Sequence, residues 1–254
     1  MADGTASWIG GVAGYDAGDP RARTLVTLDG PAGVGKSTTA RAVAGVLGFR
    51  YLDSGALYRA VTYGLLRSGI PREEWSALTP AQLEELGIQV APGEATLEIR
   101  WRGSLLSHEL RTPEVTEAVP AVARIPAVRR WLLGAQRAAA EDGRLVADGR
   151  DMGTVVFPQA WVKVFLQADL RERARRRLGD QGVDHPSGAE VEAEAQRLGA
   201  RDRQDAGREV APLRKPEGAL VVDTTDMSFQ EQVDRIAAYA REVARRPRPP
   251  GVDA

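Results

Sequence analysis

The chain has 254 residues, and its 34 basic and 35 acidic side chains leave a net charge of −1. This balance excludes a large positive field that would attract nucleic acid or an anionic membrane. Cysteine is absent and histidine occurs twice, which excludes disulfides, thiolate chemistry and metal sites built from several histidines, and disfavours a Ser-His triad.

Both ends of the chain are expected to be disordered tails, at residues 1–23 and 247–254. The first segment is rich in Gly, Ala and Asp and lacks the basic start and apolar run of a signal peptide. No stretch is long and apolar enough to span a bilayer. We therefore expect a cytoplasmic protein, and a monomer, because no helix has a spare apolar face.

The first predicted elements are a strand, a glycine-rich turn and a helix. Residues 24–28 are apolar and β-branched, which is typical of a buried parallel strand. Residues 37–47 have small and apolar side chains at helical spacing, and Gly48 is expected to end this helix. Residues 50–52 are predicted to be extended, and a second helix to run from Ser54 to about Ser68.

The middle of the chain interrupts this alternation. It predicts a loop with a short amphipathic helix at 71–85 and a strand-rich patch at 88–90, 96–101 and 105–106. Further helices are predicted at 113–123, 127–141, 171–178, 189–203 and 229–245, and further strands at 144–147, 161–166 and 219–223. Strands that alternate with helices favour an α/β fold, in which helices cover both faces of a parallel sheet.

Residues 30–37 fit the phosphate-loop pattern G-x-x-x-x-G-K-[ST], with a predicted strand before them and a helix after them. Backbone N–H groups of such a loop surround phosphate oxygens. Lys36 would reach the β- and γ-phosphates, and Ser37 would bind Mg²⁺, directly or through water. The chain has three lysines, so a chance glycine turn explains Lys36 poorly. The predicted ATP-binding residues here are Gly30, Pro31, Ala32, Gly33, Val34, Gly35, Lys36, Ser37 and Thr38.

Charged residues also follow several predicted strands, and ligands of parallel sheets gather where strands end. Asp53 and Ser54 precede Arg59, although both could simply cap a helix. Asp148 could cap a turn or lie near Mg²⁺. The tandem Arg150-Asp151 could be a surface pair, but its position after a buried strand favours a site. Further on, acids and arginines at 201, 202, 205 and 208 form one helical stripe.

Three stretches of the sequence resemble the bacterial cytidylate kinases, which are P-loop nucleoside monophosphate kinases. They are residues 53–59, 148–158 and 210–213, and the resemblance extends from about Thr24 to Arg241. It implies a three-layer α/β/α core at 24–63 and 127–246, an enlarged monophosphate-binding insert at 64–126 and a lid region at 171–205. The activity implied is transfer of a phosphoryl group from MgATP to CMP or dCMP.

The resemblance also implies roles for the matching residues. The implied monophosphate site comprises Asp53, Ser54, Arg59, Arg129, Arg150, Asp151, Arg201, Asp205 and Arg208, with Arg129 and Asp151 reading the base. A basic helix that carries Arg173, Arg176 and Arg177 would close over ATP, with Arg176 and Arg177 binding it. The implied catalytic residues are Lys36, Arg150 and Arg208.

One position departs from the family pattern, and two other kinds of function stay open. A small hydroxyl residue usually lies on the helix before the base-reading arginine, but this chain has Pro120 there, so that one base contact is lost or replaced by water. Arg59 and Arg129 could also be surface arginines on helices. A kinase for UMP, AMP or a small metabolite, or a regulatory P-loop switch or ATPase with a protein partner, could use the same phosphate loop.

Overall fold

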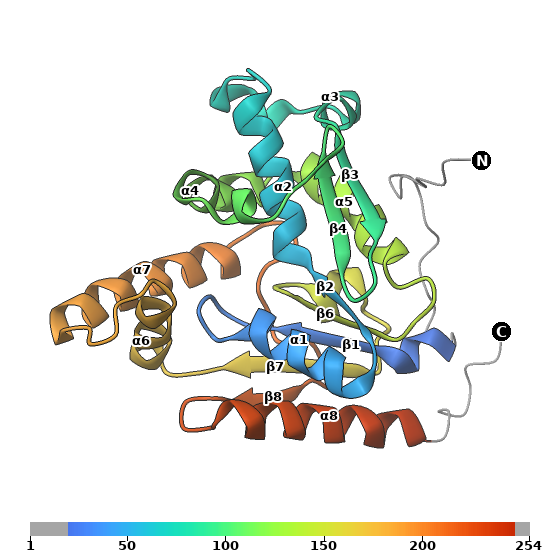
Figure 1. The fold of residues 1–254 in the computed structure, drawn as a ribbon, viewed down its shortest axis with the longest axis vertical. Helices are drawn as coiled ribbons and strands as arrows, with labels where there is room; N and C mark the ends of the chain where they lie inside the picture. The colour runs from blue at the N-terminus through green and yellow to red at the C-terminus, as the bar shows by residue number, and fades with distance from the viewer. Residues whose placement is uncertain (1–19, 247–254) are drawn as a thin grey trace. The chain divides into compact units, whose positions relative to one another are not determined.

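The computed structural model describes residues 20–246 (Figure 1). Within them the chain forms two compact units: unit 1 comprises residues 50–142, and unit 2 comprises residues 20–49 and 143–246. The predicted insert at 64–126 falls inside unit 1. Unit 1 also contains the helices α2 (Ser54–Arg67) and α5 (Pro126–Ala138), most of which we expected in the core. They belong to unit 1 because they pack against each other and, in the case of α2, against α4 (Pro113–Val122).

Unit 2 contributes four parallel strands to the five-stranded central sheet, in the order β6-β1-β7-β8. They are β1 (Leu25–Asp29), β6 (Leu145–Gly149), β7 (Val162–Gln167) and β8 (Leu220–Asp223). Every residue of β1 and β6 is buried, as expected for strands that are covered on both faces. The register pairs Asp29 with Gly149, so the ends of β1 and β6 are level. The predicted parallel α/β sheet is confirmed.

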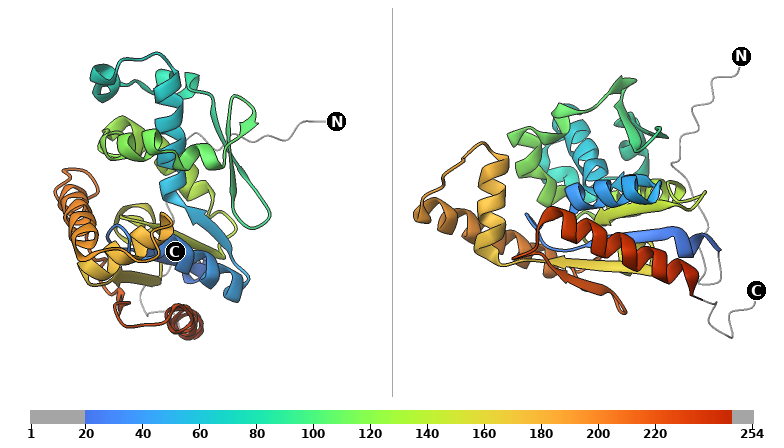
Figure 2. Two further views of the ribbon diagram at one scale, coloured as in Figure 1. Left: turned by 60° about the vertical axis from the view of Figure 1, so that its left-hand side comes forward. Right: turned by 60° about the horizontal axis from the view of Figure 1, so that its bottom comes forward.

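Four helices accompany these strands. Helices α1 (Lys36–Leu47) and α8 (Phe229–Arg245) pack against each other, and α8 runs alongside β7 (Figure 2). Helices α6 (Leu170–Asp180) and α7 (Gly188–Ala206) form a pair that follows β7 (Figure 1). Gly48 ends α1, as predicted, and adopts the left-handed conformation there. Helix α7 ends three residues later than predicted, because neither Gly nor Pro lies between Arg203 and Gly207, and Asp205 is therefore helical.

Unit 1 combines helices with a small antiparallel sheet, which has the order β3-β4-β5. Its elements are β2 (Arg50–Asp53), α2, η2 (Arg72–Ala77), α3 (Pro80–Glu85), β3 (Ile88–Pro92), β4 (Leu97–Trp101), β5 (Ser104–Leu105), η3 (His108–Arg111), α4 and α5. Thr79 and Gln82 form a capping box at the start of α3. Pro120 lies inside α4. The predicted strand-rich patch is therefore a three-stranded sheet with helices on either side in the sequence.

Three short elements, η1, η3 and η4, were not predicted. The 3-10 helix η1 (Pro20–Thr24) buries Ala22 completely, and the Ala22 carbonyl accepts the N–H of Trp161, so residues 20–23 of the expected N-terminal tail pack on unit 2. The π-helical turn η4 (Met152–Val156) follows β6. Residues 1–19 of the expected tail, and the expected tail at 247–254, lie outside the described residues. No helix within residues 20–246 is both long and apolar enough to cross a bilayer.

Candidate functional site

The phosphate loop connects β1 to α1, at the C-terminal end of a buried strand, as its sequence pattern predicts. Gly30 begins the loop with φ +156, and a Cβ placed there would lie 2.3 Å from the carbonyl oxygen of Leu166 on β7. Only glycine can pass so close to the neighbouring strand. Gly35 has φ +88 and precedes the first residue of α1, so the loop turns directly into a helix N-terminus, where N–H groups are available to anions.

Lys36 lies inside this loop rather than in solvent. Its side chain is 6% exposed, and its Nζ donates a hydrogen bond of 2.7 Å to the carbonyl oxygen of Pro31. Burial lowers the pKa of Lys36 well below its ordinary value, and the guanidinium of Arg150 lowers it further. Arg150 follows β6, so two buried or half-buried cations from neighbouring strand ends act on each other.

Ser37 faces a carboxylate at the end of β6. Its Oγ donates a hydrogen bond of 3.0 Å to Oδ2 of Asp148, which is buried. A hydroxyl and a carboxylate are oxygen ligands of the kind that Mg²⁺ binds. Among residues 20–246 no three His, Cys, Asp or Glu side chains are grouped to hold an ion by themselves. A magnesium ion at Ser37 would therefore need further ligands from phosphate and water.

Three arginines surround the carboxylate of Asp205 near the end of α7. Arg150 Nε donates to Asp205 Oδ2 at 2.8 Å, and Arg208 donates to Oδ1. Asp205 is 2% exposed. Its burial would raise its pKa, but Arg150 and Arg208, with a further contribution from Arg201, outweigh burial and hold the pKa below its ordinary value. One ionised carboxylate among three guanidinium groups leaves an excess positive charge that suits an anionic ligand.

Asp151 is also buried, and a carboxylate that we did not assign to the site supports the segment that carries it. Asp29, the last residue of β1, is 0% exposed. Its Oδ1 accepts the N–H of Met152 at 2.8 Å, and its Oδ2 accepts the N–H of Gly153 at 2.7 Å. Burial raises the pKa of Asp29 to about 7. A charged residue at the end of an apolar strand was a visible signal, but its partners lie more than 120 residues further along the chain.

The basic helix α6 uses two of its arginines to contact the chain's own backbone. Arg173 is buried and donates to the carbonyl oxygens of Ala32 and Ala168 and to the carboxylate of Asp202. Arg176 donates to the carbonyl oxygens of residues 224 and 225 and pairs with Glu172. Arg177 is partly exposed. Arg173 and Arg176 therefore tie α6 to the phosphate loop and to the segment after β8.

Three predicted site residues of unit 1 lie at the start of α2 or in its second turn. Asp53 caps α2 by accepting the N–H of Ala56 at 2.9 Å, and Ser54 is the buried first residue of that helix. Arg59 Nη1 donates to the Leu110 carbonyl oxygen at 3.0 Å and to Thr116 Oγ1 at 2.8 Å. These bonds hold the guanidinium of Arg59 between α2, η3 and α4, so Arg59 has structural partners in addition to the role we expect.

Arg129, which starts the second turn of α5, is not a surface residue. Its side chain is 7% exposed, and its Nη1 donates to the Ala123 carbonyl oxygen at 3.1 Å. The guanidinium lies 5.4 Å from the centroid of the Tyr58 ring, in a cation–π contact. A guanidinium that is fixed in this way is oriented for recognition of a planar ligand. The interpretation of Arg129 as a solvated helix residue is therefore wrong.

Comparison with known proteins places the chain in a family. The family profile described as "Cytidylate kinase" matches residues 26–242. Cytidylate kinase from Streptococcus pneumoniae (strain 70585) is 41% identical over 221 residues, covering 85% of this chain and 97% of that protein. Cytidylate kinase from Geobacillus sp. (strain WCH70) is 40% identical, with coverage of 85% and 96%. A bifunctional pantoate ligase/cytidylate kinase from Synechococcus sp. (strain JA-2-3B'a(2-13)) is 41% identical, covering 92% of this chain and 43% of that protein. With a match over this length, the chain belongs to the cytidylate kinase family.

Proposed function

We propose that this chain transfers the γ-phosphoryl group of MgATP to CMP or dCMP, and so forms ADP and CDP or dCDP. Family membership supports this proposal, and one structural observation carries it. Burial lowers the pKa of Lys36, and the nearby guanidinium of Arg150 lowers it further. A buried ammonium group and a half-buried guanidinium repel each other at low dielectric. Phosphate groups bound between them would relieve that repulsion, as phosphoryl transfer requires.

On the donor side, the loop from Gly30 to Thr38 would bind the ATP phosphates through its N–H groups, with Lys36 on the β- and γ-phosphates. Ser37, with Asp148 hydrogen-bonded behind it, would hold Mg²⁺. The ion supplies charge neutralisation for the phosphates when bound. Arg176 and Arg177 are proposed to approach ATP from α6. For Arg176 this requires an exchange of its bonds to the carbonyl oxygens of residues 224 and 225.

On the acceptor side, unit 2 would hold the monophosphate with the arginines around Asp205. Arg150 and Arg208 are proposed to contact its phosphate, and Arg201 and Asp205 its sugar and phosphate. Unit 1 would contribute Asp53, Ser54 and Arg59, with Arg59 on the phosphate. Arg59 Nη1 makes the bonds to Leu110 and Thr116, and a guanidinium has five donors in all. Such a side chain can bind a phosphate while it keeps its structural partners.

The base is proposed to be cytosine because of the chemistry of Asp151 and Arg129. A carboxylate accepts and a guanidinium donates. Asp151 can therefore accept from the cytosine N4 amino group, and Arg129 can donate to N3 or O2. Uracil would present an O4 acceptor to Asp151 and an N3–H donor to Arg129. Each mispaired buried group costs about 1–3 kcal/mol, which is enough for strong selection. Pro120 removes a possible third contact.

The proposed chemistry needs positioning and charge stabilisation rather than a covalent intermediate. The acceptor phosphate is already a nucleophile, so no general base is required. Lys36 would stabilise charge on the donor side, and Arg150 and Arg208 would stabilise it on the acceptor side, which makes these three the proposed catalytic residues. Water must be excluded, or it would accept the phosphoryl group. We further propose that the protein is a cytoplasmic monomer.

The test is an ADP-release assay with ATP alone and with CMP, dCMP, UMP, AMP or a small metabolite as acceptor. CMP and dCMP are expected to give the highest kcat/KM, and ATP alone is expected to give little ADP. Faster turnover with UMP or AMP would show that the acceptor is not CMP, but would still support the assignment as a kinase. ATP turnover that does not depend on any monophosphate would instead support a P-loop switch or ATPase. Sedimentation at several protein concentrations tests the oligomeric state, and a mass of one chain is expected at each concentration.

A further inference from the structure

The peptide group between Pro31 and Ala32, inside the phosphate loop, is bonded on both sides to charged side chains. Its carbonyl oxygen accepts from Lys36 Nζ at 2.7 Å, and its N–H donates to Oδ1 of Asp202 on α7 at 3.0 Å. Asp202 therefore places a carboxylate directly on a loop whose other N–H groups are proposed to bind an anionic ligand. A carboxylate in that position repels phosphate unless another group neutralises it.

Arg173 of α6 supplies that neutralising charge. Its Nη1 lies 2.6 Å from Asp202 Oδ2 and donates to the carbonyl oxygen of Ala32 at 2.9 Å. Its Nε donates to the carbonyl oxygen of Ala168, directly after β7, at 3.2 Å. The side chain of Arg173 is 8% exposed and that of Asp202 is 20% exposed. The two residues form a neutral bracket that holds the N–H and the C=O of Ala32 and joins them to the end of β7.

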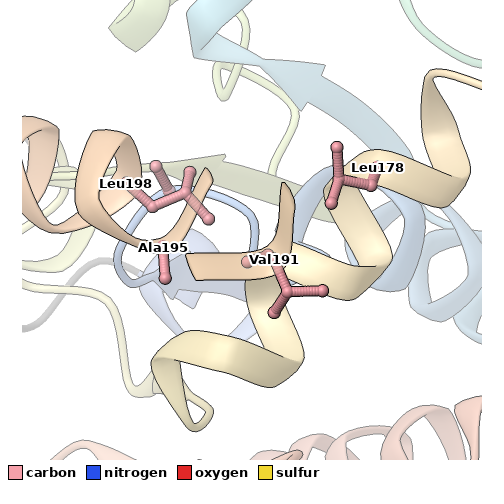
Figure 3. Close-up of a cluster of buried hydrophobic side chains, with 6 residues drawn as sticks. Leu178, Val191, Ala195 and Leu198 are labelled. Atoms are coloured by element: carbon pink, nitrogen blue, oxygen red, sulfur yellow. The ribbon is translucent and has the colours of Figure 1, made fainter. Parts of the chain in front are cut away.

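Apolar packing also holds Ala32 in place. The methyl group of Ala32 belongs to an apolar cluster with Ala174 and Leu178 of α6 and with Val191, Ala195 and Leu198 of α7, part of which is labelled in Figure 3. Gly33 has φ +73, and a Cβ there would lie 3.3 Å from Leu198 Cδ1 and 3.4 Å from the Arg173 carbonyl oxygen. The loop is thus pressed against both helices, and its shape depends on where they hold it.

We propose that Asp202 and Arg173 are positioning residues for the donor site, which fix the phosphate loop in the shape that binds the ATP phosphates. The inference rests on the proposed function of this loop. A glycine-rich loop loses conformational entropy when it orders around a ligand, so a loop that is ordered beforehand binds more tightly. The bracket supplies that order with charge-assisted hydrogen bonds, and neither residue needs to touch phosphate.

The MgADP affinities of Asp202 variants distinguish a positioning role of Asp202 from a purely electrostatic one. Asp202→Asn keeps an oxygen for the Ala32 N–H but turns an amide N–H toward Arg173, and it adds one net positive charge. Electrostatics alone predicts tighter binding of MgADP to this variant, whereas positioning predicts weaker binding. Arg173→Met/Asp202→Asn restores the net charge of the pair. Electrostatics alone predicts wild-type affinity for this double variant, and positioning predicts weak binding again.

The experiment is calorimetric titration of the full chain with MgADP and, separately, with CMP. We expect the Kd of MgADP to rise about tenfold in Asp202→Asn and in the double variant, because a charge-assisted bond is lost, while the Kd of CMP stays within about twofold. Glu192→Gln is the matched control, since Glu192 pairs with Arg171 at a solvent-exposed position on the same two helices, and its affinities are expected to be those of the wild type.

The proposal is overturned if Asp202→Asn binds MgADP as tightly as, or more tightly than, the wild type. If the Tm of that variant is lower while its Kd is unchanged, the bracket only stabilises the fold. If Asp202→Asn does not fold, Asp202→Glu keeps the charge but displaces the carboxylate, and wild-type affinity there would refute positioning. A wild type that does not bind MgADP would instead refute the proposed donor site itself.

Discussion

Asp29 gives the most quantitative prediction, because its buried carboxylate is expected to make stability depend on pH. Burial raises its pKa from 3.8 to about 7, against the opposing effect of the N–H groups of Gly153 and Met152. Asp151 raises the pKa further, and Lys36 lowers it. The charge of Asp29 also acts on Lys163, whose pKa it raises against the opposing effect of burial. A shift of this size corresponds to about 4 kcal/mol of difference between the folded and unfolded states.

The sign follows from which state binds the proton. Between the unfolded pKa and the folded pKa, the unfolded chain has lost the proton of Asp29 while the folded protein keeps it. Ionisation therefore stabilises the unfolded state alone, and the free energy of unfolding falls as pH rises from about 4 to about 7. Below that window, Asp29 is protonated in both states, and its full contribution to stability is present.

The assay is urea unfolding of the wild type and of Asp29→Asn between about pH 4.5 and about pH 8. Over this range the unfolding free energy of the wild type, minus that of Asp29→Asn, is expected to fall by about 3 kcal/mol. Asn cannot ionise, so the difference isolates Asp29. Asp169→Asn is the control: the N–H groups that Asp169 caps on α6 hold its pKa below its ordinary value, so its difference is expected to be flat over this range. A flat difference for Asp29→Asn would refute the reasoning.

Three other substitutions test the site and its packing. Lys36→Ala is expected to abolish phosphoryl transfer and to keep the circular dichroism spectrum, and near-normal turnover would refute the loop assignment. Gly153→Ala should cost about 1–3 kcal/mol of stability, because its Cβ would lie 2.8 Å from Pro216 Cγ, whereas Gly179→Ala has open space, and equal losses would contradict this account. Asp151→Asn should narrow the ratio of kcat/KM for CMP over UMP, since an amide can donate to O4, and an unchanged ratio would exclude Asp151 from base recognition.

Local patterns predicted most of the fold. The strand before Gly30, the helix after it and the left-handed Gly48 at its end depend on neighbouring residues, so the sequence displays them directly. The same is true of the helix that Asp53 caps, because an Asx cap acts within three residues. The phosphate loop was predictable for the same reason: its motif and its secondary structure are contiguous.

The unpredicted features depend on partners that are far apart in the sequence. The turn η4 forms around Asp29, whose bonds go to residues 123 and 124 positions away. Asp202 was visible within a helical stripe, but its partner at Ala32 lies 170 residues earlier. Arg173 was expected on a basic helix that closes over ATP, but the sequence of such a helix does not show which of its arginines is buried. Which arginine is buried depends on tertiary packing, and a single sequence does not show that packing.

The division of unit 2 into two segments has a consequence for how the protein folds during synthesis. Strand β1 pairs with β6 and β7, and its first residue, Leu25, lies opposite Leu145, 120 residues later. Residues 50–142, all of unit 1, leave the ribosome before β6 does. The strand that leads into the phosphate loop must therefore wait without these neighbours, exposed to mispairing. The segment between β1 and β6 acts as a long loop that must close when these strands pair. If unit 1 becomes compact first, this loop is effectively shorter, and less entropy is lost when β1 and β6 meet.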